Sequence, residues 1–516
     1  MTTRDGSAGA TDPAVPLIPF PASVRAGTGE PLAVAGTVRL VTDGGSAVVR
    51  SVVLDLLSGV GIGVAARDDE GVPTVELVIT DEQNSVSEPA GSPESYALST
   101  TAAGARIVAP APAGLFFGAQ TLAQLLANDG TGTAEVAALE IEDAPRFAYR
   151  GVMLDVARHF FDVATVTSVI DRIALAKINH LHLHVSDDQG WRVHIDSWPL
   201  LTERGATSAV GGGTGGFFSP DDYREIVAYA AERFVTIVPE IDLPGHTHAA
   251  LVAYPELAPT GYAGAPDATG APDEPYHGTE VGFSTVDVAT DATYRFVADV
   301  TRELADLTPG PYLHLGGDES HSTSAEDYLE FLRRASAVAA DTGKTLVFWH
   351  EAGRSPDLPP GSIGQYWGFV EASDGADALA RRFVDRGGRV ILSPADAIYL
   401  DMKHSEEDPR GLVWADGPTS VRRAYSWDPD DVIPGVVEDA VLGVEAPLWS
   451  ETIDSLAGID ALAFPRLLAA AEIAWSPRPD ESDERTWESF RHRVAAWRPR
   501  LEGLGVGFTR ADGIEW

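Results

Sequence analysis

Cysteine is absent from the sequence, and its absence excludes several kinds of chemistry at once. The protein can form no disulfide bond, no thiolate metal site and no cysteine nucleophile. The absence leaves the redox compartment open, because a protein without cysteine functions equally well in a reducing or an oxidising one. Any catalysis must therefore use other side chains.

Positive charge is also scarce. Lysine and arginine together number 37 against 77 aspartates and glutamates, which gives a formal net charge of -40. Only Lys177, Lys344 and Lys403 are lysines. A protein with a pI near 4.5 is repelled by nucleic acid and by anionic membranes, so we expect neither as a partner. The acidic residues are scattered along the chain, which indicates a soluble surface and not an acidic tail.

Long apolar segments are missing as well. No stretch reaches the roughly 20 consecutive apolar residues that a membrane-spanning helix needs. Residues 1–21 carry neither the basic region nor the apolar region of a signal peptide, so we expect a soluble, cytoplasmic protein. The glycine-rich residues 211–216 neither follow a strand pattern nor open a helix. No phosphate-binding loop is predicted, and we expect no cofactor and no metal.

The chain is long enough for one large α/β domain and a smaller one, and its 44% hydrophobic content is ordinary for a globular protein. Residues 1–145 predict the smaller, N-terminal α+β domain. Short β-branched strands are expected at 38–41 and 75–79, and a helix is expected at 115–126, where apolar residues recur at helical spacing. A proline-containing DAPR segment marks the boundary, so the larger domain is expected over residues 146–516.

Short apolar runs alternate with helical patterns from Tyr149 onward, which is typical of βα units and a parallel sheet. The eight runs are residues 151–156, 178–185, 234–240, 312–315, 345–349, 363–366, 389–392 and 443–448. Eight such units over about 370 residues fit a (β/α)8 TIM barrel with long loops better than an open sheet.

The fourth run leads into the most informative stretch, Tyr312–Ser320, with the sequence YLHLGGDES. Its two glycines allow the backbone to bend sharply and to pass close to a ligand. Asp318 and Glu319 follow directly, beyond the C-terminal end of a strand, where a barrel keeps its active site. A lone acidic pair at such a place is more often an N-cap, here of a helix beginning near Ser324. The surroundings favour a catalytic role instead.

Charged and aromatic side chains stand at the ends of all eight runs. In chain order they are Arg158, Asp187–Arg192, Glu240–His246, Asp318 with Glu319, Trp349, Trp367, Tyr399 with Asp401, and Trp449 with Glu451. Proteins bind sugars with such sets, placing charged groups on the hydroxyls and tryptophan against the apolar ring faces. A single tryptophan is more often a core residue, but three at strand ends beside carboxylates predict a sugar pocket.

Five segments resemble the motifs of the family 20 glycoside hydrolases, the β-N-acetylhexosaminidases. In the family's order they are RGVMLDVARHFF (Arg150–Phe161), HLHLHVSDDQGWR (His180–Arg192), EIDLPGH (Glu240–His246), HLGGDES (His314–Ser320) and APLWSE (Ala446–Glu451). The N-terminal domain resembles the accessory α+β domain of that family more loosely. The resemblance implies a catalytic (β/α)8 barrel and an exo-acting, retaining enzyme whose partner is an oligosaccharide ending in an N-acetylhexosamine.

The resemblance also implies a role for each matching residue. Glu319 would be the general acid/base, and Asp318 would orient and polarise the 2-acetamido group of the substrate, with Tyr399 hydrogen-bonded to its carbonyl oxygen. The other implied residues are Trp349, Trp367 and Trp449 around the acetamido methyl group, Arg158, Asp401 and Glu451 on the outer hydroxyls, and Asp187 and His246 in a polar relay near Glu319. Tyr366 precedes Trp367, and either of the two aromatic rings could face the pocket.

The implied mechanism is substrate-assisted. The acetamide oxygen attacks C1 and gives an oxazolinium intermediate, so no protein nucleophile is needed. A carboxylate must stabilise the positive charge that develops on the acetamide nitrogen, and Asp318 suits that role. We expect a neighbouring carboxylate and burial to raise the pKa of Glu319 and so to keep this acid protonated.

A metal-dependent barrel hydrolase is one competing interpretation. His180, His182 and His184 share one face of a strand, and His246 and His248 form a second His-x-His pattern, which can bind zinc. Only one histidine of the first set can lie at the strand end, and an Asp-Glu pair has no role in a zinc site. Incubation with a strong chelator separates the two interpretations.

A sugar-binding barrel without catalysis is the other competing interpretation. The presence of Asp318, Glu319 and Tyr399 disfavours it, and turnover of a chromogenic β-N-acetylglucosaminide would exclude it. Three questions stay open at this level: the preference for N-acetylglucosamine or N-acetylgalactosamine, the natural glycan, and the oligomeric state.

Overall fold

The computed structural model describes residues 15–43, 45–65, 71–80, 92–127, 133–266 and 274–516. The chain forms two compact units, and each is described by itself. Unit 1 consists of residues 1–146, 475–506 and 514–516, and unit 2 consists of residues 147–474 and 507–513.

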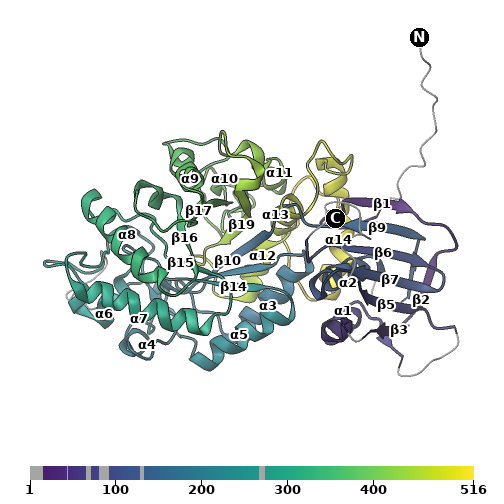
Figure 1. The fold of residues 1–516 in the computed structure, drawn as a ribbon, viewed down its shortest axis with the longest axis horizontal. Helices are drawn as coiled ribbons and strands as arrows, with labels where there is room; N and C mark the ends of the chain where they lie inside the picture. Colours follow the sequence, from purple (N-terminus) through teal and green to yellow (C-terminus); the bar gives the residue numbers. More distant parts are fainter. Residues whose placement is uncertain (1–14, 44, 66–70, 81–91, 128–132, 267–273) are drawn as a thin grey trace, which may run out of the picture. The chain divides into compact units, whose positions relative to one another are not determined.

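Unit 2 is a closed barrel of eight parallel strands, as the sequence predicts (Figure 1). In barrel order the strands are β10 (Tyr149–Asp155), β11 (His180–His184), β14 (Thr236–Glu240), β15 (Tyr312–His314), β16 (Thr345–Trp349), β17 (Ile363–Tyr366), β18 (Arg389–Leu392) and β19 (Val441–Leu448). Strand β10 pairs in parallel with both β11 and β19, which closes the barrel. Each apolar run expected from the sequence forms one of these strands.

Helices alternate with the strands of the barrel and surround it (Figure 1). The longer ones are α3 (Val163–Leu175), α5 (Pro220–Glu232), α7 (Asp291–Leu307), α8 (Ala325–Ala340), α9 (Ala376–Asp385), α12 (Leu456–Ala463) and α13 (Arg466–Trp475). The short ones are α4 (Leu200–Glu203), α6 (His248–Ala253), α10 (Ala395–Ile398) and α11 (Val421–Tyr425), and a small ladder joins β12 (Ser186–Asp187) to β13 (Gly190–Trp191). Helix α3 buries the apolar stripe that its sequence predicts, namely Val166, Val169, Ile170, Ile173 and Ala174.

Local capping fixes where two of these helices begin. The Asp162 side chain accepts the backbone N–H of Thr165 at the start of α3. At the start of α8, the Ser324 hydroxyl accepts the backbone N–H of Asp327 at 3.1 Å. A serine therefore caps α8, and the acidic pair that precedes it in the sequence is free for another role.

Apolar side chains fill the N-terminal part of the barrel interior. One buried cluster consists of Tyr149, Val238, Val347, Ile363, Ile391 and Leu442, one residue from each of six strands, and the half-buried Tyr312 packs against it. The opposite, C-terminal ends of the strands carry Asp155, His184, Glu240, His314 and Trp349. The barrel therefore has an apolar base, and its polar residues gather where the strands end.

Unit 1 contains the α+β fold that the N-terminal sequence predicts. A seven-stranded sheet has the order β1 (Ser23–Ala26), β9 (Leu139–Asp143), β6 (Tyr96–Thr101), β7 (Gly104–Ala109), β5 (Thr74–Ile79), β3 (Thr37–Thr42) and β4 (Gly63–Val64). A separate ladder joins β2 (Leu32–Ala35) to β8 (Thr133–Val136). The helices of this unit are α1 (Arg50–Gly59), α2 (Pro112–Leu126) and α14 (Trp487–Gly503).

The assignment of α14 to unit 1 differs from our expectation that the barrel domain runs to residue 516. The reason is a set of contacts between this helix and the start of the chain. Arg493 donates to the carbonyl oxygen of Leu17 at 2.8 Å, and the Trp497 indole donates to that of Pro16 at 3.0 Å. Both side chains are buried, so the last helix completes the N-terminal unit.

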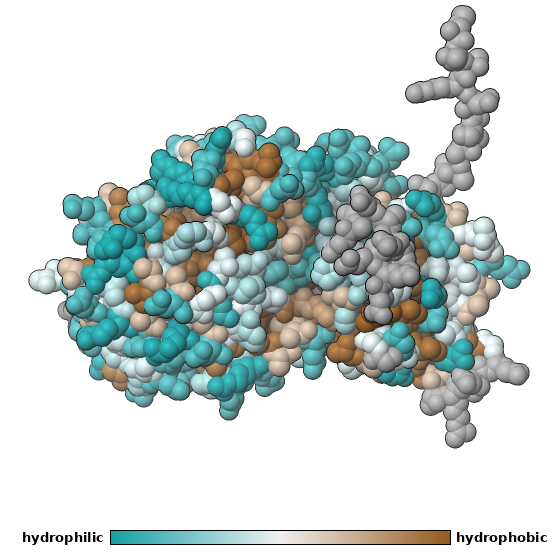
Figure 2. All heavy atoms as spheres, in the orientation of Figure 1, coloured by the Kyte–Doolittle hydropathy of each residue, from teal (hydrophilic) through white to brown (hydrophobic). Residues whose placement is uncertain are grey.

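Hydrophilic residues dominate the face of the molecule in Figure 2, with apolar residues in small separate groups on unit 2. This agrees with a formal net charge of -40. Among the residues that the structure describes, no helix has both the length and the apolar character needed to cross a bilayer.

Candidate active site

A sharp turn after β15 places the acidic pair at the C-terminal end of the barrel. Gly316 and Gly317 have φ angles of 65° and 105°, in the region that only glycine adopts easily. A Cβ atom on Gly316 would lie 1.7 Å from Oδ1 of Asp242, so the turn also needs the space that glycine leaves. Glu319 itself has a φ of 40°, an uncommon value that marks a constrained position.

The acidic pair lies in a cavity of about 390 Å³, large enough for one sugar residue. Twelve residues line it: Arg158, Thr279, Val281, Asp318, Glu319, Trp349, Trp367, Tyr399, Leu412, Trp414, Trp449 and Glu451. Eight of the eleven site residues named from the sequence are among them. The other three, Asp187, His246 and Asp401, are buried behind this lining.

Aromatic rings form the walls of the cavity. The ring centroids of Trp349 and Trp449 are 6.1 Å apart, with their planes inclined by 38°. Tyr399 packs in a cluster with Met402 and Ala415, against which Trp367 and Trp449 also pack. Such rings offer flat apolar surfaces to a sugar or to a methyl group.

Trp367, and not Tyr366, faces the cavity. The Tyr366 ring is fully buried, and its hydroxyl donates to the carbonyl oxygen of Phe369 at 2.6 Å. The Trp367 indole lines the cavity and donates to Oε2 of Glu351 at 3.0 Å. Burial and the charge of Asp318 raise the pKa of Glu351 to about 8, so this neighbour is protonated at neutral pH.

The two carboxyl groups of the acidic pair have different environments. The Asp318 side chain is 10% exposed and the Glu319 side chain 30%. Burial raises the pKa of Asp318 to about 6, against the charge of His246. Nε2 of His246 lies 3.5 Å from Oε2 of Glu319 and 3.9 Å from Oδ2 of Asp318.

Our expectation that the pKa of Glu319 is raised is wrong for the free protein. Burial does raise it, but the hydrogen bond and the positive charge of His246 outweigh burial, and the pKa lies below its usual value. The pKa of His246 is in turn well above the usual value for histidine: burial lowers it, but the charges of Asp187 and Asp242 outweigh burial. The proton that an acid needs is therefore carried next to Glu319, on the imidazole.

A buried relay supports His246 from behind. Oδ2 of Asp187 lies 3.1 Å from Nδ1 of His246, 3.0 Å from Nε2 of His184 and 2.8 Å from Nη2 of Arg158. Burial raises the pKa of Asp187, but the charges of Arg158 and His246 outweigh burial and hold it well below its usual value. The lowered pKa keeps Asp187 ionised, in contact with three basic side chains, Arg158, His184 and His246.

Arg158 and Glu451 line another part of the cavity, and Asp401 is buried close to them. The Arg158 guanidinium lies over the Trp449 ring, 4.7 Å from its centroid, and its Nε atom has no hydrogen-bond partner. Oε2 of Glu451 and both carboxylate oxygens of Asp401 are also buried without a hydrogen-bond partner. Burial raises the pKa of Asp401 well above its usual value, and the charge of Glu451 adds to this. Unpaired buried polar atoms of this kind are suited to the hydroxyls of a ligand.

Sequence reasoning missed several residues of this site. Trp414 lines the cavity mouth with 47% of its surface exposed, and its ring meets Tyr399 edge to face, with centroids 5.5 Å apart. It lies in a long loop, far from any strand end, so no pattern indicated it. Asp242 lies in a motif that was recognised, yet its role was not: its Oδ1 accepts the backbone N–H of Gly317 at 3.0 Å and so holds the turn before the acidic pair.

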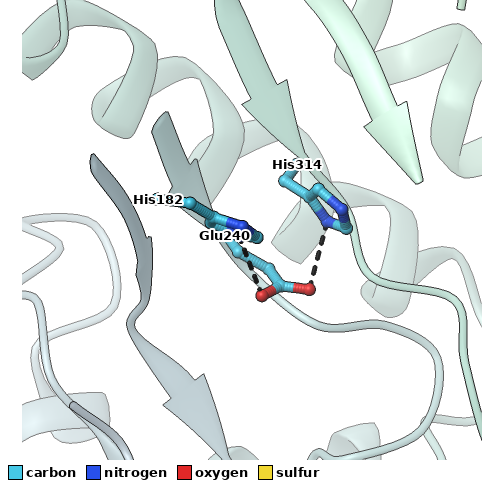
Figure 3. Close-up of side chains that lie close together, drawn as sticks. All are labelled: His182, Glu240 and His314. Atoms are coloured by element: carbon cyan, nitrogen blue, oxygen red, sulfur yellow. Dashed lines mark ion pairs between the residues drawn. The ribbon is translucent and has the colours of Figure 1, made fainter. Parts of the chain in front are cut away.

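The histidines of the competing zinc interpretation lie in different surroundings. His180 stacks on Tyr149 with ring centroids 3.9 Å apart, and His248 bonds to Tyr262 and to the carbonyl oxygen of Glu274. Ligand atoms of His182, Glu240 and His314 do lie within 4.8 Å of one another. In Figure 3 both imidazoles approach the two oxygens of one carboxylate, at 3.1 Å each. The three side chains are thus in close contact with one another, and Nδ1 of His314 also accepts the backbone N–H of Gly316 at 3.0 Å.

Two family profiles match the chain. The profile described as glycosyl hydrolase family 20, catalytic domain, matches residues 147–478. The profile described as glycosyl hydrolase family 20, domain 2, matches residues 14–144.

Relatives and solved structures match over 80–98% of the chain. A β-N-acetylhexosaminidase from Cellulomonas fimi is 40% identical over 508 residues, which covers 98% of both chains. A β-hexosaminidase from Porphyromonas gingivalis is 35% identical over 80% of this chain and 54% of its own. The Streptomyces plicatus N-acetyl-β-hexosaminidase, solved in complex with thio-NAglucal, has a TM-score of 0.87 and 42% identity over 98% of both chains. Another structure, described as a glycoside hydrolase family 20 β-N-acetylglucosaminidase, has a TM-score of 0.86 and 50% identity over 98% of this chain and 100% of its own.

Proposed function

The chain belongs to glycosyl hydrolase family 20 and is a β-N-acetylhexosaminidase, and from this premise we propose that it removes terminal, non-reducing β-linked N-acetylhexosamines by substrate-assisted catalysis with retention of configuration. One observation carries the proposal. A buried, ionisable Asp318 stands beside the more exposed Glu319 in a cavity whose walls are tryptophan and tyrosine. This arrangement suits a charge-stabilising carboxylate and a proton donor acting on one N-acetylated sugar.

In the first step, the acetamide oxygen of the bound sugar attacks C1 while the bond from C1 to the leaving oxygen breaks. Positive charge spreads onto the acetamide nitrogen, and the Asp318 carboxylate stabilises it. The Tyr399 hydroxyl, on the cavity lining, donates to the acetamide oxygen and fixes its direction of attack. The protein then needs no nucleophile of its own.

Glu319 gives its proton to the leaving oxygen in the same step. Because the proton in the free protein resides on His246, 3.5 Å away, it moves to Glu319 as the substrate displaces water from the cavity. In the second step Glu319 takes a proton from the water that attacks C1. The oxazolinium ring opens, and the acetamide is regenerated on a sugar of unchanged anomeric configuration.

Arg158, Asp401 and Glu451 hold the outer hydroxyls of the terminal sugar. Their unpaired buried atoms offer both donors and acceptors, so hydroxyls complete bonds that the free protein leaves open. These residues close the cavity beyond the terminal sugar. The enzyme is therefore exo-acting, and its partner is an oligosaccharide with a free non-reducing end.

Product analysis on chitotetraose tests this function directly. Early in the reaction we expect monosaccharide and trisaccharide in equal amounts, with the β-anomer of the monosaccharide formed first. Disaccharide as the main early product would contradict exo action, and the α-anomer first would contradict retention. Absence of turnover on both chitotetraose and a nitrophenyl N-acetyl-β-glucosaminide would overturn the enzymatic function itself.

A further inference from the structure

Glu240 is the last residue of β14 and is fully buried. Its two carboxylate oxygens contact side chains that belong to two different parts of the site. Oε1 accepts the indole N–H of Trp349 at 2.8 Å. Oε2 lies 2.5 Å from Nδ1 of His184. Glu240 does not line the cavity, so it acts on the substrate only indirectly, and these two neighbours connect it to the site.

The first connection leads to the wall of the cavity. Trp349 lines the cavity, while its indole N–H is bonded to Glu240 outside the lining. Its ring packs beside Trp449, with 6.1 Å between centroids. The hydrogen bond from the indole N–H restricts the side-chain torsions of Trp349. The carboxylate of Glu240 therefore sets the position of the ring surface against which the acetamido group packs.

The second connection leads to the acid. Nε2 of His184 lies 3.0 Å from Oδ2 of Asp187, and that same oxygen lies 3.1 Å from Nδ1 of His246. Nε2 of His246 lies 3.5 Å from Glu319. Three side chains therefore join Glu240 to the proton donor, and each is held on both sides by a charged or hydrogen-bonded neighbour.

Three histidines face Glu240: His182 and His314, which Figure 3 shows, and His184, which follows His182 on β11. Burial lowers the pKa of His182 and His184, but the neighbouring carboxylates outweigh burial and raise these pKa values to about 10 and about 9. The pKa of His314 is lowered, chiefly by burial.

These charges alternate along the barrel interior. His182 lies between Glu240 and Glu445, and its Nδ1 is 2.9 Å from Oε1 of Glu445. His184 lies between Glu240 and Asp187. At neutral pH two imidazolium ions thus separate three carboxylates, and Glu240 is the central one, with both neighbours charged and both oxygens occupied.

We propose that Glu240 is a positioning residue for the reaction, whose single carboxylate holds both the Trp349 wall of the acetamido pocket and, through His184 and Asp187, the His246–Glu319 pair. The inference rests on the proposed function, because it assigns the wall and the acid to the same reaction. Binding of the N-acetyl group and transfer of the proton then both depend on one buried carboxylate that does not contact the substrate.

Replacement by glutamine provides the test. The Glu240→Gln side chain has one acceptor oxygen and one NH2 group, so it cannot accept both the Trp349 N–H and the proton of His184. Glu445→Gln is the matched control: Glu445 is equally buried in the barrel and accepts from His182, Tyr149 and Gln365, but it bonds to neither Trp349 nor His184. Both variants disturb the polar interior, and only the first breaks a connection to the site.

We expect Glu240→Gln to lower kcat/KM for chitobiose by about 10²-fold, the scale of an ångström of misplacement. The loss should be larger for chitobiose than for a nitrophenyl glycoside, the inhibition constant of N-acetylglucosamine should rise, and the pH profile of kcat/KM should shift. Glu445→Gln should retain the pH profile and the leaving-group dependence of the unmodified enzyme. The same shifts in both variants, or unchanged profiles in Glu240→Gln, would overturn the proposal.

Two further variants keep the proposal testable even where Glu240→Gln does not fold. Trp349→Phe removes the indole N–H of the first connection together with one ring of the cavity wall, so the double-mutant cycle is needed to isolate the bond, and His184→Asn cuts the second connection. We expect the first to weaken product binding and the second to increase the leaving-group dependence. In a double-mutant cycle, Glu240→Gln and Trp349→Phe should be non-additive, since both remove one bond. Additive losses, or single variants with neither effect, would contradict the inference while wild-type turnover left the proposed function intact.

Discussion

At the scale of residues, the electrostatics of the site centre on the pair formed by His246 and Glu319. Asp187 and Asp242 stabilise the charged imidazole, and the imidazolium in turn lowers the pKa of Glu319. Nε2 of His246 lies 3.5 Å from Oε2 of Glu319, so the protonation state of each group depends on the charge of the other. A proton donor for sugar hydrolysis is thereby available even though Glu319 alone is a carboxylate in the free protein.

Glu319→Gln tests the acid role. The amide keeps the shape of the side chain but delivers no proton, and general acid catalysis is typically worth about 10²–10⁴-fold. The variant should lose far more activity on chitobiose than on the nitrophenyl glycoside, because nitrophenolate leaves without protonation. Steady-state kinetics on both substrates checks this, with the circular dichroism spectrum as the control for folding. Equal losses on the two substrates would count against Glu319 as the acid.

The pKa of Asp318 predicts the acid limb of the pH profile. Burial raises this pKa from its usual value to about 6, so lowering the pH through 6 protonates the carboxylate that must stabilise the acetamide nitrogen. We expect kcat/KM to fall about tenfold per pH unit below this point. The measurement is kcat/KM between pH 4.5 and 8 on the nitrophenyl glycoside, with stability followed in parallel. A flat profile down to pH 4.5 in the folded protein would contradict the role of Asp318.

At the scale of elements, the barrel strands and the motif at the end of β15 could be predicted because each follows from a local pattern. Apolar runs of four to eight residues bounded by turns indicate buried parallel strands, and all eight were located. The glycine turn before Asp318 could also be predicted from the sequence. In the structure, Gly316 leaves space for Asp242 and adopts a φ of 65°. What could not be predicted depends on chain segments far apart in sequence. Trp414 lines the cavity from a loop, and Glu240 is hydrogen-bonded to Trp349, which is 109 residues later in the sequence.

Ser324→Ala separates the capping role from the catalytic one. Because the Ser324 hydroxyl caps α8, its removal should lower the free energy of unfolding by about 1 kcal/mol and leave kcat/KM unchanged. Urea denaturation and the standard assay measure the two effects. Asp162→Ala, at the N-cap of α3, is the matched control and should have a similar cost in stability. A large loss of activity in Ser324→Ala would mean that the start of α8 takes part in the site.

At the scale of the whole molecule, the chain combines a formal net charge of -40 and a largely hydrophilic face (Figure 2) with a partly aromatic cavity in unit 2. The composition predicts that nucleic acid and anionic membranes are not partners, which stays a prediction, and it gives no indication of what the protein binds. The substrate class followed from the site instead. The division into units could be predicted only in part from the sequence. Helix α14 belongs to the N-terminal unit because Arg493 and Trp497 donate hydrogen bonds to residues more than 400 positions away.

The central claim is that the acetamide of the substrate is the nucleophile, and the most direct measurement of it is kcat for nitrophenyl β-glucosaminides that carry N-acetyl, N-fluoroacetyl, N-difluoroacetyl and N-trifluoroacetyl groups. Each fluorine withdraws electrons from the carbonyl oxygen and makes it a poorer nucleophile, while the size of the group changes little. If the acetamide is the nucleophile, kcat falls at every step of the series, by orders of magnitude in total. A kcat that stays constant while only KM changes would show that the acetamide is merely bound, and would contradict the mechanism.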